Sequence, residues 1–316
     1  MKKLTTIDRF SDGAKIQGFF LCVEKRIRES RTHELYIDCL LRDMTGQVPA
    51  KIWEKVDHFD SKFDQGDPVA VSGRVESYQN HLQLIIQKIN RASVQYYGRY
   101  GYDPALIVPA SPYDPGDLWR TAVAHIKKIK NQYLRTLVSK LYRQNKDRIL
   151  VHPGSLTMHH NYRSGFLEHT VSMVRLGQTL AQHYQVDTDL FMAGIFLHDI
   201  GKLREIQPGF DLEYTDEGHF IGHIVLGRDI ILETAAGIKD FPKELLRQLE
   251  HLILAHQGRY EWQSPVTPKL KEALLLHYLD NMDAKMNLFN KALAEDKETG
   301  DWTDRRNYFR SNLFKK

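Results

Sequence analysis

The hydrophobic pattern of this 316-residue chain changes from a period near two to a period near 3.6 after residue 92. Up to that residue, short runs rich in β-branched and aromatic residues alternate in part with polar positions, which is typical of strands. The predicted strands are 13–28, 33–43, 46–53, 68–78 and 82–92. The stretch "EKVDHFDSKFDQG" (54–66) predicts one helix that ends at its glycine. The predicted order is therefore three strands, a helix and two strands.

From residue 118 onward, apolar residues recur every three or four positions, which predicts helices. Residues 118–149 predict a basic amphipathic helix or helix pair. In the next predicted helix, one face carries Phe166, His169, Met173, Leu176 and Leu180. Residues 93–117 contain four prolines and three glycines and predict an extended linker. We therefore expect a multi-domain chain with a β-barrel at 1–92, a linker at 93–117 and an all-α helical bundle at 118–316.

The predicted strand order matches that of the five-stranded OB barrel, whose helix lies between strands three and four. The stretches "LRDMTGQVPAKIW" and "GDPVAVSGRV" resemble the nucleic-acid-binding OB-fold group that includes tRNA anticodon-binding domains. Such barrels bind single strands through aromatic stacking and basic side chains. The candidate binding residues are Tyr36, Lys51, Trp53, Arg74, Tyr78 and His81. Trp53 could instead belong to the barrel core, although its neighbour in alternation, Lys51, points to the same face.

The net charge of +4 is unevenly distributed along the chain. Residues 120–150 carry nine basic residues and one acidic residue, whereas residues 151–300 carry 14 basic and 21 acidic residues. The basic run includes Lys127, Lys128 and Lys130, which are candidates for contacts to a nucleic-acid backbone. Two readings of this run remain open, namely an anion-binding surface and a solvated helix face. The aromatic cluster Tyr96–Tyr102 with Arg99 likewise fits stacking on bases or packing between domains.

Polar residues interrupt the apolar helices of the second region at three places. His169 lies in an apolar stripe, the run "AGIFLHDIGK" ends in His198-Asp199, and Asp280 follows Leu279 in an apolar helix. Adjacent helical residues diverge by about 100°, so the pair at 198–199 can reach one point only where a helix ends. Gly201 provides that end. Burying such groups is unfavourable unless each has a partner, and a shared metal ion would satisfy them together.

This H…HD…D pattern resembles that of the HD-domain metal-dependent phosphohydrolases, over about residues 155–290. The resemblance implies that His169, His198, Asp199 and Asp280 bind metal, with Asp199 bridging two ions, and that His223 and His256 hold the second ion. We expect Lys202 to contact the phosphate or the leaving oxygen. His159 and His160 are expected to bind phosphate or to support the ligands. Imidazole and carboxylate ligands suit Mn, Fe, Co, Ni or Zn, and we expect one or two ions, with Mn favoured by the resemblance.

The whole chain resembles the YhaM family of bacterial 3′-5′ exoribonucleases, in domain order and in "HHNYRSGFLEHT" and "FLHDIGKL". The resemblance implies a metal-dependent enzyme that removes nucleoside 5′-monophosphates from single-stranded RNA, and from single-stranded DNA as well. Two alternatives are a hydrolase of free nucleotides and a single-strand-binding factor with a vestigial metal site. No secretory signal precedes the first strand and no apolar run is long enough to span a membrane. We therefore expect a cytoplasmic protein with no membrane partner. Because HD enzymes often oligomerise and a barrel edge favours association, we also expect a homo-oligomer.

Overall fold

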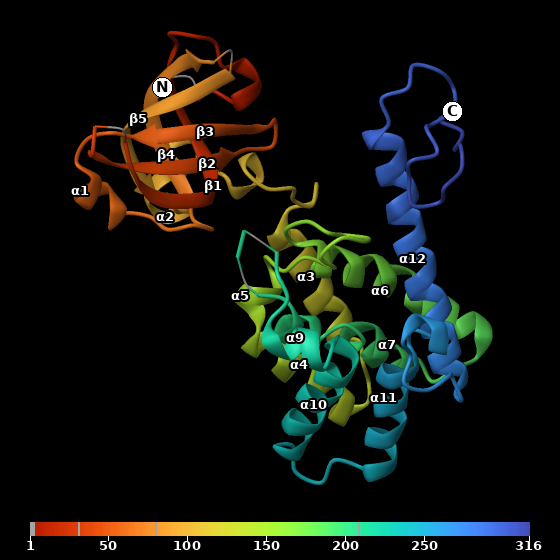
Figure 1. The fold of residues 1–316 in the computed structure, drawn as a ribbon. Helices are drawn as coiled ribbons and strands as arrows, with labels where there is room; N and C mark the ends of the chain where they lie inside the picture. Colours follow the sequence, from red (N-terminus) through yellow and green to blue (C-terminus); the bar gives the residue numbers. More distant parts are fainter. Residues whose placement is uncertain (1–3, 31, 80, 208, 211) are drawn as a thin grey trace. The chain divides into compact units, whose positions relative to one another are not determined.

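The structure is a computed structural model and describes residues 4–30, 32–79, 81–207, 209–210 and 212–316. The chain forms two compact units. One consists of Met1–Ala110 with Gly209–Leu212, and the other of Ser111–Pro208 with Glu213–Lys316. The first unit is a β-barrel and the second is helical (Figure 1). The predicted fold class, a barrel followed by an all-α bundle, is therefore confirmed.

The barrel contains five strands that close in the order β1-β2-β3-β5-β4. The strands are β1 (Lys15–Glu29), β2 (Leu35–Arg42), β3 (Gln47–Ile52), β4 (Pro68–Tyr78) and β5 (His81–Arg91). Neighbouring strands are antiparallel except for β3 and β5, which pair in parallel. Helix α1 (Val56–Asp60) lies between β3 and β4 in the chain, as the sequence predicts. The five strands and the helix have the OB-barrel arrangement.

Alternation along the strands builds the barrel core. In β2, Ile37, Cys39 and Leu41 are buried while the residues between them are half-buried, because successive strand side chains point to opposite faces. Both cysteines are free thiols inside this core. A hydrogen bond from Cys22, together with burial, raises the pKa of the Cys39 thiol. The two cysteines therefore serve as core packing residues, as expected for reduced thiols.

The predicted extended linker at 93–117 is only partly correct. It contains helix α2 (Val94–Tyr97) and two short 3-10 turns, Gly98–Tyr100 and Pro104–Leu106. Tyr102 is buried against Phe19 of β1, with ring centroids 5.0 Å apart, so this segment packs on the barrel itself. The prolines and glycines of this segment suggested an extended chain, but Asp103 and the proline after it start a helical turn.

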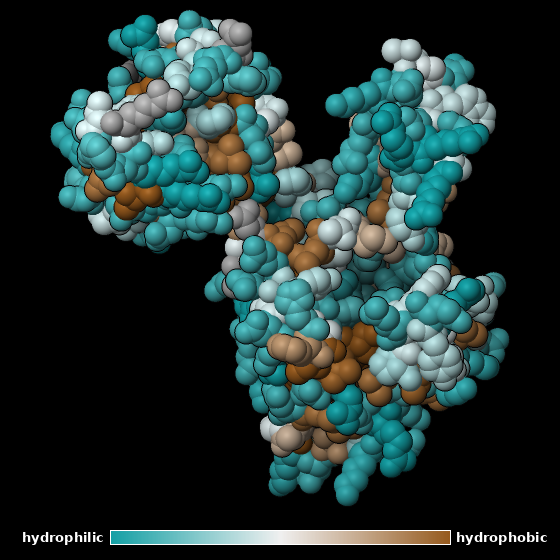
Figure 2. All heavy atoms as spheres, in the orientation of Figure 1, coloured by the Kyte–Doolittle hydropathy of each residue, from teal (hydrophilic) through white to brown (hydrophobic). Residues whose placement is uncertain are grey.

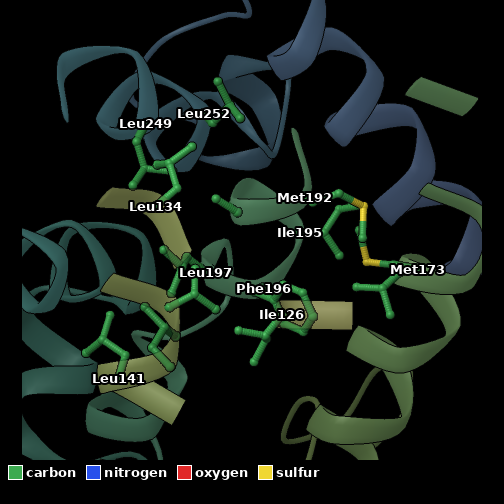
Figure 3. Close-up of a cluster of buried hydrophobic side chains, with 14 of the residues drawn as sticks. Ile126, Leu134, Leu141, Met173, Met192, Ile195, Phe196, Leu197, Leu249 and Leu252 are labelled. Carbon is green, nitrogen blue, oxygen red and sulfur yellow. The ribbon is translucent and has the colours of Figure 1, made fainter. Parts of the chain in front are cut away.

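The helical unit packs around helix α7 (Thr188–Leu197). Its other helices are α3 (Pro115–Ile126), α4 (Gln132–Gln144), α5 (Lys146–Ile149), α6 (Gly165–Tyr184), α8 (Lys202–Glu205), α9 (Asp216–Phe220), α10 (His223–Ala236), α11 (Lys243–Ala255) and α12 (Lys271–Glu295). Every residue of α7 from 190 to 197 is buried, which marks a helix enclosed on all sides. Figure 3 shows apolar side chains from α3, α4, α6 and α11 meeting those of α7. Hydrophilic side chains cover most of the face of each unit seen in Figure 2.

One local prediction in this unit is wrong in detail. Leu176 is 47% exposed, and Gly177 takes its place in the α6 stripe because a side chain there would collide with Ile195. The start of α7 is capped by Asp187, whose carboxylate accepts the Leu190 N–H. Among the described residues, no helix has the length and apolar character that crossing a bilayer requires.

The basic C-terminal tail, residues 296–316, is folded rather than loose. Its residues Lys315 and Asp296 form an ion pair, and a backbone bridge joins Trp302 to Phe314. Arg306 and Lys316 also pair with carboxylates inside the segment. Three of the five basic residues after position 300 are thus neutralised within the tail, so it contributes less positive charge than the sequence suggests.

Candidate metal centre and nucleic-acid surface

The buried end of α7 brings the predicted polar residues into the core. The helix ends at Leu197, and His198 and Asp199 follow on its last turn, 1% and 4% exposed. Gly201 then lies against the start of α10, where an added Cβ would be 1.9 Å from the His223 carbonyl oxygen. Only glycine permits this approach, and it places the start of α10 beside the His198-Asp199 pair.

One group of potential metal ligands joins α6, the end of α7 and α12. It consists of His169, His198 and Asp280. The Nε2 atoms of His169 and His198 lie 3.3 Å apart, and Oδ1 of Asp280 lies 3.2 Å from His169 Nε2 and 3.9 Å from His198 Nε2. Three donor atoms from three helices therefore converge on one point in the core.

A second group lies beside the first. It consists of Asp199, His223 and His256. Oδ1 of Asp199 lies 3.6 Å from His223 Nε2 and 3.9 Å from His256 Nε2, while Oδ2 of the same carboxylate lies 3.3 Å from His198 Nε2. The two oxygens of Asp199 therefore face the two groups, as a bridging carboxylate would.

The tautomers of the four histidines suit metal binding. Metal-binding histidines usually donate one ring N–H to an acceptor, which leaves the other nitrogen free for the ion. The Nδ1–H groups are held by Asp283 (2.7 Å from His169), the Ile195 carbonyl (2.9 Å from His198), Glu205 (3.0 Å from His223) and the Ile253 carbonyl (2.7 Å from His256). Within the described part of the chain, the buried Nε2 of His223 has no hydrogen-bond partner. The donor set thus fits divalent metal ions.

Electrostatics at the first group favour a positive charge. Burial lowers the pKa of His169, but its hydrogen bonds to Asp280 and Asp283 outweigh burial and raise the pKa to about 10. Burial would raise the pKa of Asp280, yet the His169 hydrogen bond holds it below its usual range. At the second group, burial lowers the pKa of His256 to about 4, so its imidazole is neutral and able to bind metal. The carboxylates of Asp280 and Asp283 thus stabilise positive charge on His169 in the first group, whereas His256 in the second group is a neutral donor.

Lys202 lies beside Asp199 in the pocket. Its Nζ donates to Asp199 Oδ2 and to the Gly154 carbonyl, both at 2.6 Å. Burial lowers the pKa of Lys202, but the charge of Asp199 outweighs burial and raises this pKa, so the ammonium stays charged.

His159 lines the pocket next to the ligands, whereas His160 is 3% exposed and its Nε2 lies 3.7 Å from Asp283. Of the two histidines, only His159 is placed among the residues that line the pocket.

Four of the six predicted barrel residues form one compact cluster of three aromatic rings around a lysine. Tyr36 and Trp53 stack with ring centroids 4.5 Å apart, and Lys51 Nζ lies 5.2, 5.3 and 5.8 Å from the rings of Tyr36, Trp53 and Tyr78. Trp53 is 42% exposed, so its alternative placement in the barrel core is wrong. Arg74 lies four residues before Tyr78 on β4, about 13 Å along the strand, and is not part of this cluster.

Within the basic run, Lys128 and Lys130 lie at the far end of α7 from the ligand groups. The backbone N–H of Lys130 donates to Asp189, in the first turn of α7, and Lys128 and Lys130 line a separate pocket there. The ten residues of α7 span about 15 Å. A bound strand would therefore have to extend at least that far to contact this run and the ligand groups together.

Comparisons with known proteins agree with both units. The HD domain family matches residues 166–285, and the OB-fold nucleic acid binding domain family matches residues 21–92. The 3′-5′ exoribonuclease YhaM of Shouchella clausii (strain KSM-K16) is 32% identical over 311 residues, which covers 96% of this chain and 96% of that protein. The chain belongs to the YhaM family. The YhaM protein of Bacillus subtilis (strain 168) is also 32% identical, over 85% of this chain and 84% of its own length.

Among solved structures, the second OB-fold domain of replication protein A from Methanococcus maripaludis aligns with a TM-score of 0.25 at 18% identity. That alignment covers 29% of this chain and 96% of that domain. At this score it adds nothing to the assignment of the barrel, which rests on strand order and pairing.

Sequence reasoning missed two carboxylates at the centre of this YhaM-family chain. Asp283 accepts from His169 and also from the Ser172 hydroxyl, and Glu205 accepts both the ring N–H and the backbone N–H of His223. A signal existed for each, since Asp283 and Glu205 lie three residues after Asp280 and Lys202, on the same helix face. In this chain, Asp283 and Glu205 thus hold the Nδ1–H groups of His169 and His223.

Proposed function

We propose that this chain is a metal-dependent 3′-5′ exoribonuclease that hydrolyses single-stranded RNA, and single-stranded DNA as well, to nucleoside 5′-monophosphates. The observation that carries the proposal is the pair of adjacent ligand groups facing one pocket. The relatives that match over the whole chain are named 3′-5′ exoribonucleases, which supplies the direction and the substrate. An intact ligand set disfavours a vestigial site.

We assign His169, His198 and Asp280 to one ion and His223 and His256 to a second, with Asp199 offering one oxygen to each. We propose Mn as the physiological metal, although Fe, Co, Ni and Zn suit the same donors. When bound, such ions lower the pKa of a coordinated water and stabilise charge on phosphoryl oxygens. Asp283 and Glu205 orient His169 and His223. Lys202 fixes Asp199 and keeps a positive charge where a phosphate would enter.

In this proposal the barrel binds the strand that the helical unit cleaves. The exposed rings of Trp53 and Tyr78 and the half-buried ring of Tyr36 lie around Lys51, so they offer stacking and a cation to unpaired bases. We assign Lys127, Lys128 and Lys130 to backbone contacts, with Arg74 as a further barrel contact. Because each phosphate contact releases counterions, replacing the three lysines by Gln should flatten the salt dependence of binding by about 0.7 in log–log slope per lost contact. An unchanged slope would mark this run as a solvated helix face.

The decisive assay uses 5′-labelled single-stranded RNA with and without added Mn. The proposal predicts products that shorten progressively from the 3′ end, together with nucleoside 5′-monophosphates, only when metal is present. A hydrolase of free nucleotides would turn over nucleotides and leave the RNA intact. A binding factor would retain the RNA and cleave neither substrate. We also propose a cytoplasmic location and a homo-oligomer, for which light scattering should give a mass that is a multiple of 36.8 kDa.

A further inference from the structure

A pocket of about 400 Å³ opens from the candidate metal centre. Its lining includes His159, Lys202, His223 and Asp280, so the pocket reaches both ligand groups. The rest of the wall carries side chains that the hydrolysis of a phosphodiester does not itself require. They include Tyr214, Trp262, Lys285 and Tyr308. This wall is where the part of the substrate beyond the reacting phosphate would lie.

Helix α12 connects the ligands to the aromatic wall. Its lining residues are Asp280, Asn281, Ala284, Lys285 and Leu288, which share one helix face. Lys285 follows Asp280 by five residues, about 7.5 Å along the helix axis. A cation therefore stands one to two helical turns from a ligand, within reach of a neighbouring phosphate or sugar.

The folded tail brings Tyr308 to this wall. Lys285 Nζ donates to the Tyr308 hydroxyl and lies 4.0 Å from the ring centroid. The next residue, Phe309, packs edge-on against Phe289 of α12 with centroids 5.5 Å apart. Tyr308 is 44% exposed, so part of its ring stays accessible. The tail thus holds an aromatic ring in the pocket, with a cation near one of its faces.

Trp262 is held in a similar way after α11. Gly258 has a φ of +76°, and an added Cβ there would lie 2.4 Å from the His277 ring, so this turn requires glycine. The Ser264 hydroxyl contacts the Leu254 carbonyl at 3.2 Å and the Val266 carbonyl at 2.8 Å, which fixes the loop. Trp262 is 40% exposed, and the guanidinium of Arg259 lies 5.2 Å from its ring centroid. Both rings are therefore positioned by the chain itself.

We propose that Trp262 and Tyr308 form the subsite for the 3′-terminal nucleoside, with its base stacked on their rings and its phosphate directed to the ligand groups. This inference rests on the proposed exonuclease function. An exonuclease must accept every base in turn, and stacking is tolerant of sequence because every base has a π-face. A 3′ end has no further nucleotide to accommodate, so a pocket of about 400 Å³ beside the ligand groups suits it. Lys285 would contact the sugar–phosphate backbone of the same nucleotide.

The test compares RNA with a normal 3′-terminal nucleotide and RNA of equal length that ends in an abasic ribose. The full chain should cleave the abasic end with a kcat/KM lower by about 5- to 150-fold, the loss expected for one stacked base. Tyr308→Leu and Trp262→Leu should lower kcat/KM for the normal end and reduce the discrimination between the two ends. Tyr308→Phe keeps the ring and should keep the discrimination. Tyr184→Leu, a control at an exposed tyrosine on α6, should change neither value.

The outcomes separate this inference from the function on which it rests. Equal cleavage of both ends by the unmodified chain would overturn the subsite and leave the exonuclease standing. Unchanged discrimination in both leucine variants would overturn it as well. If neither RNA is cleaved, the proposed function fails, and binding decides the subsite. Adenosine 5′-monophosphate should then quench the tryptophan fluorescence of Trp53→Phe, which lacks the barrel tryptophan, but not that of the double variant Trp53→Phe/Trp262→Phe, and ribose 5-phosphate should quench neither. Equal quenching of both proteins by the nucleotide would exclude the subsite.

Discussion

Replacing Asp283 by Asn should weaken metal binding without removing a ligand. The carboxylate accepts the His169 Nδ1–H at 2.7 Å through one oxygen and the Ser172 hydroxyl through the other. Asn keeps the size and one acceptor oxygen but loses the negative charge that makes the His169 ring more basic. Removing such a supporting partner typically lowers metal affinity by about 10- to 100-fold, which corresponds to about 1.4–2.7 kcal/mol.

The assay is a Mn titration of RNA hydrolysis at fixed, saturating RNA. We expect the Mn concentration at half-maximal rate to rise by about 10- to 100-fold, while the rate at saturating Mn stays within a few fold of the original. Asp229→Asn, which removes a partly exposed carboxylate on α10, should leave the titration unchanged. An unchanged Mn dependence in Asp283→Asn would refute the reasoning, as would a loss of rate that excess Mn fails to restore.

Three further predictions concern packing, pH and the barrel. Gly201→Ala should lower both Tm and nuclease activity, because its Cβ would meet the His223 carbonyl oxygen at 1.9 Å, whereas Gly300→Ala, with open space around it, should change neither. Burial lowers the pKa of His152 to about 4, so between pH 6.5 and 4 the unfolded chain binds a proton that the folded chain does not, and stability falls by up to about 3 kcal/mol. In urea unfolding, the free energy of unfolding of His152→Asn should therefore fall less over that pH range than that of the original chain. An equal fall would show that His152 is not responsible. Trp53→Ala should weaken binding of long single strands by about 5- to 150-fold in a filter-binding assay and leave the cleavage of dinucleotides unchanged, and a parallel loss on both substrates would contradict a separate binding role for the barrel.

The sequence was most informative where one physical constraint acts along the chain. Strand alternation predicted the five strands of the barrel because each strand has one buried face. The apolar run before His198 and Asp199 predicted that these two polar residues are buried, and both are. Gly201 predicted the end of the helix at which they lie.

The sequence was least informative where a prediction requires the orientation of a side chain or the contacts of a segment outside the helices and strands. The spacing of three residues places Asp283 on the helix face of Asp280, but its contact with a nitrogen of His169 depends on the packing of α6 against α12. The basic residues of the tail indicated charge but not structure, because its fold depends on ion pairs such as Lys315 with Asp296. Leu176 was placed in the buried stripe because sequence spacing cannot show that close packing of α6 on α7 requires glycine at the next position.

The measurement that tests the central claim most directly is the metal content of purified Asp199→Asn beside that of the unmodified chain, with nuclease activity recorded on the same samples. Because one oxygen of Asp199 faces each ligand group, we expect the variant to remain folded by circular dichroism, to retain less Mn after dialysis and to lose RNA hydrolysis. A variant that keeps its full metal content and hydrolyses RNA at the original rate would contradict the claim that these two groups form the catalytic metal centre.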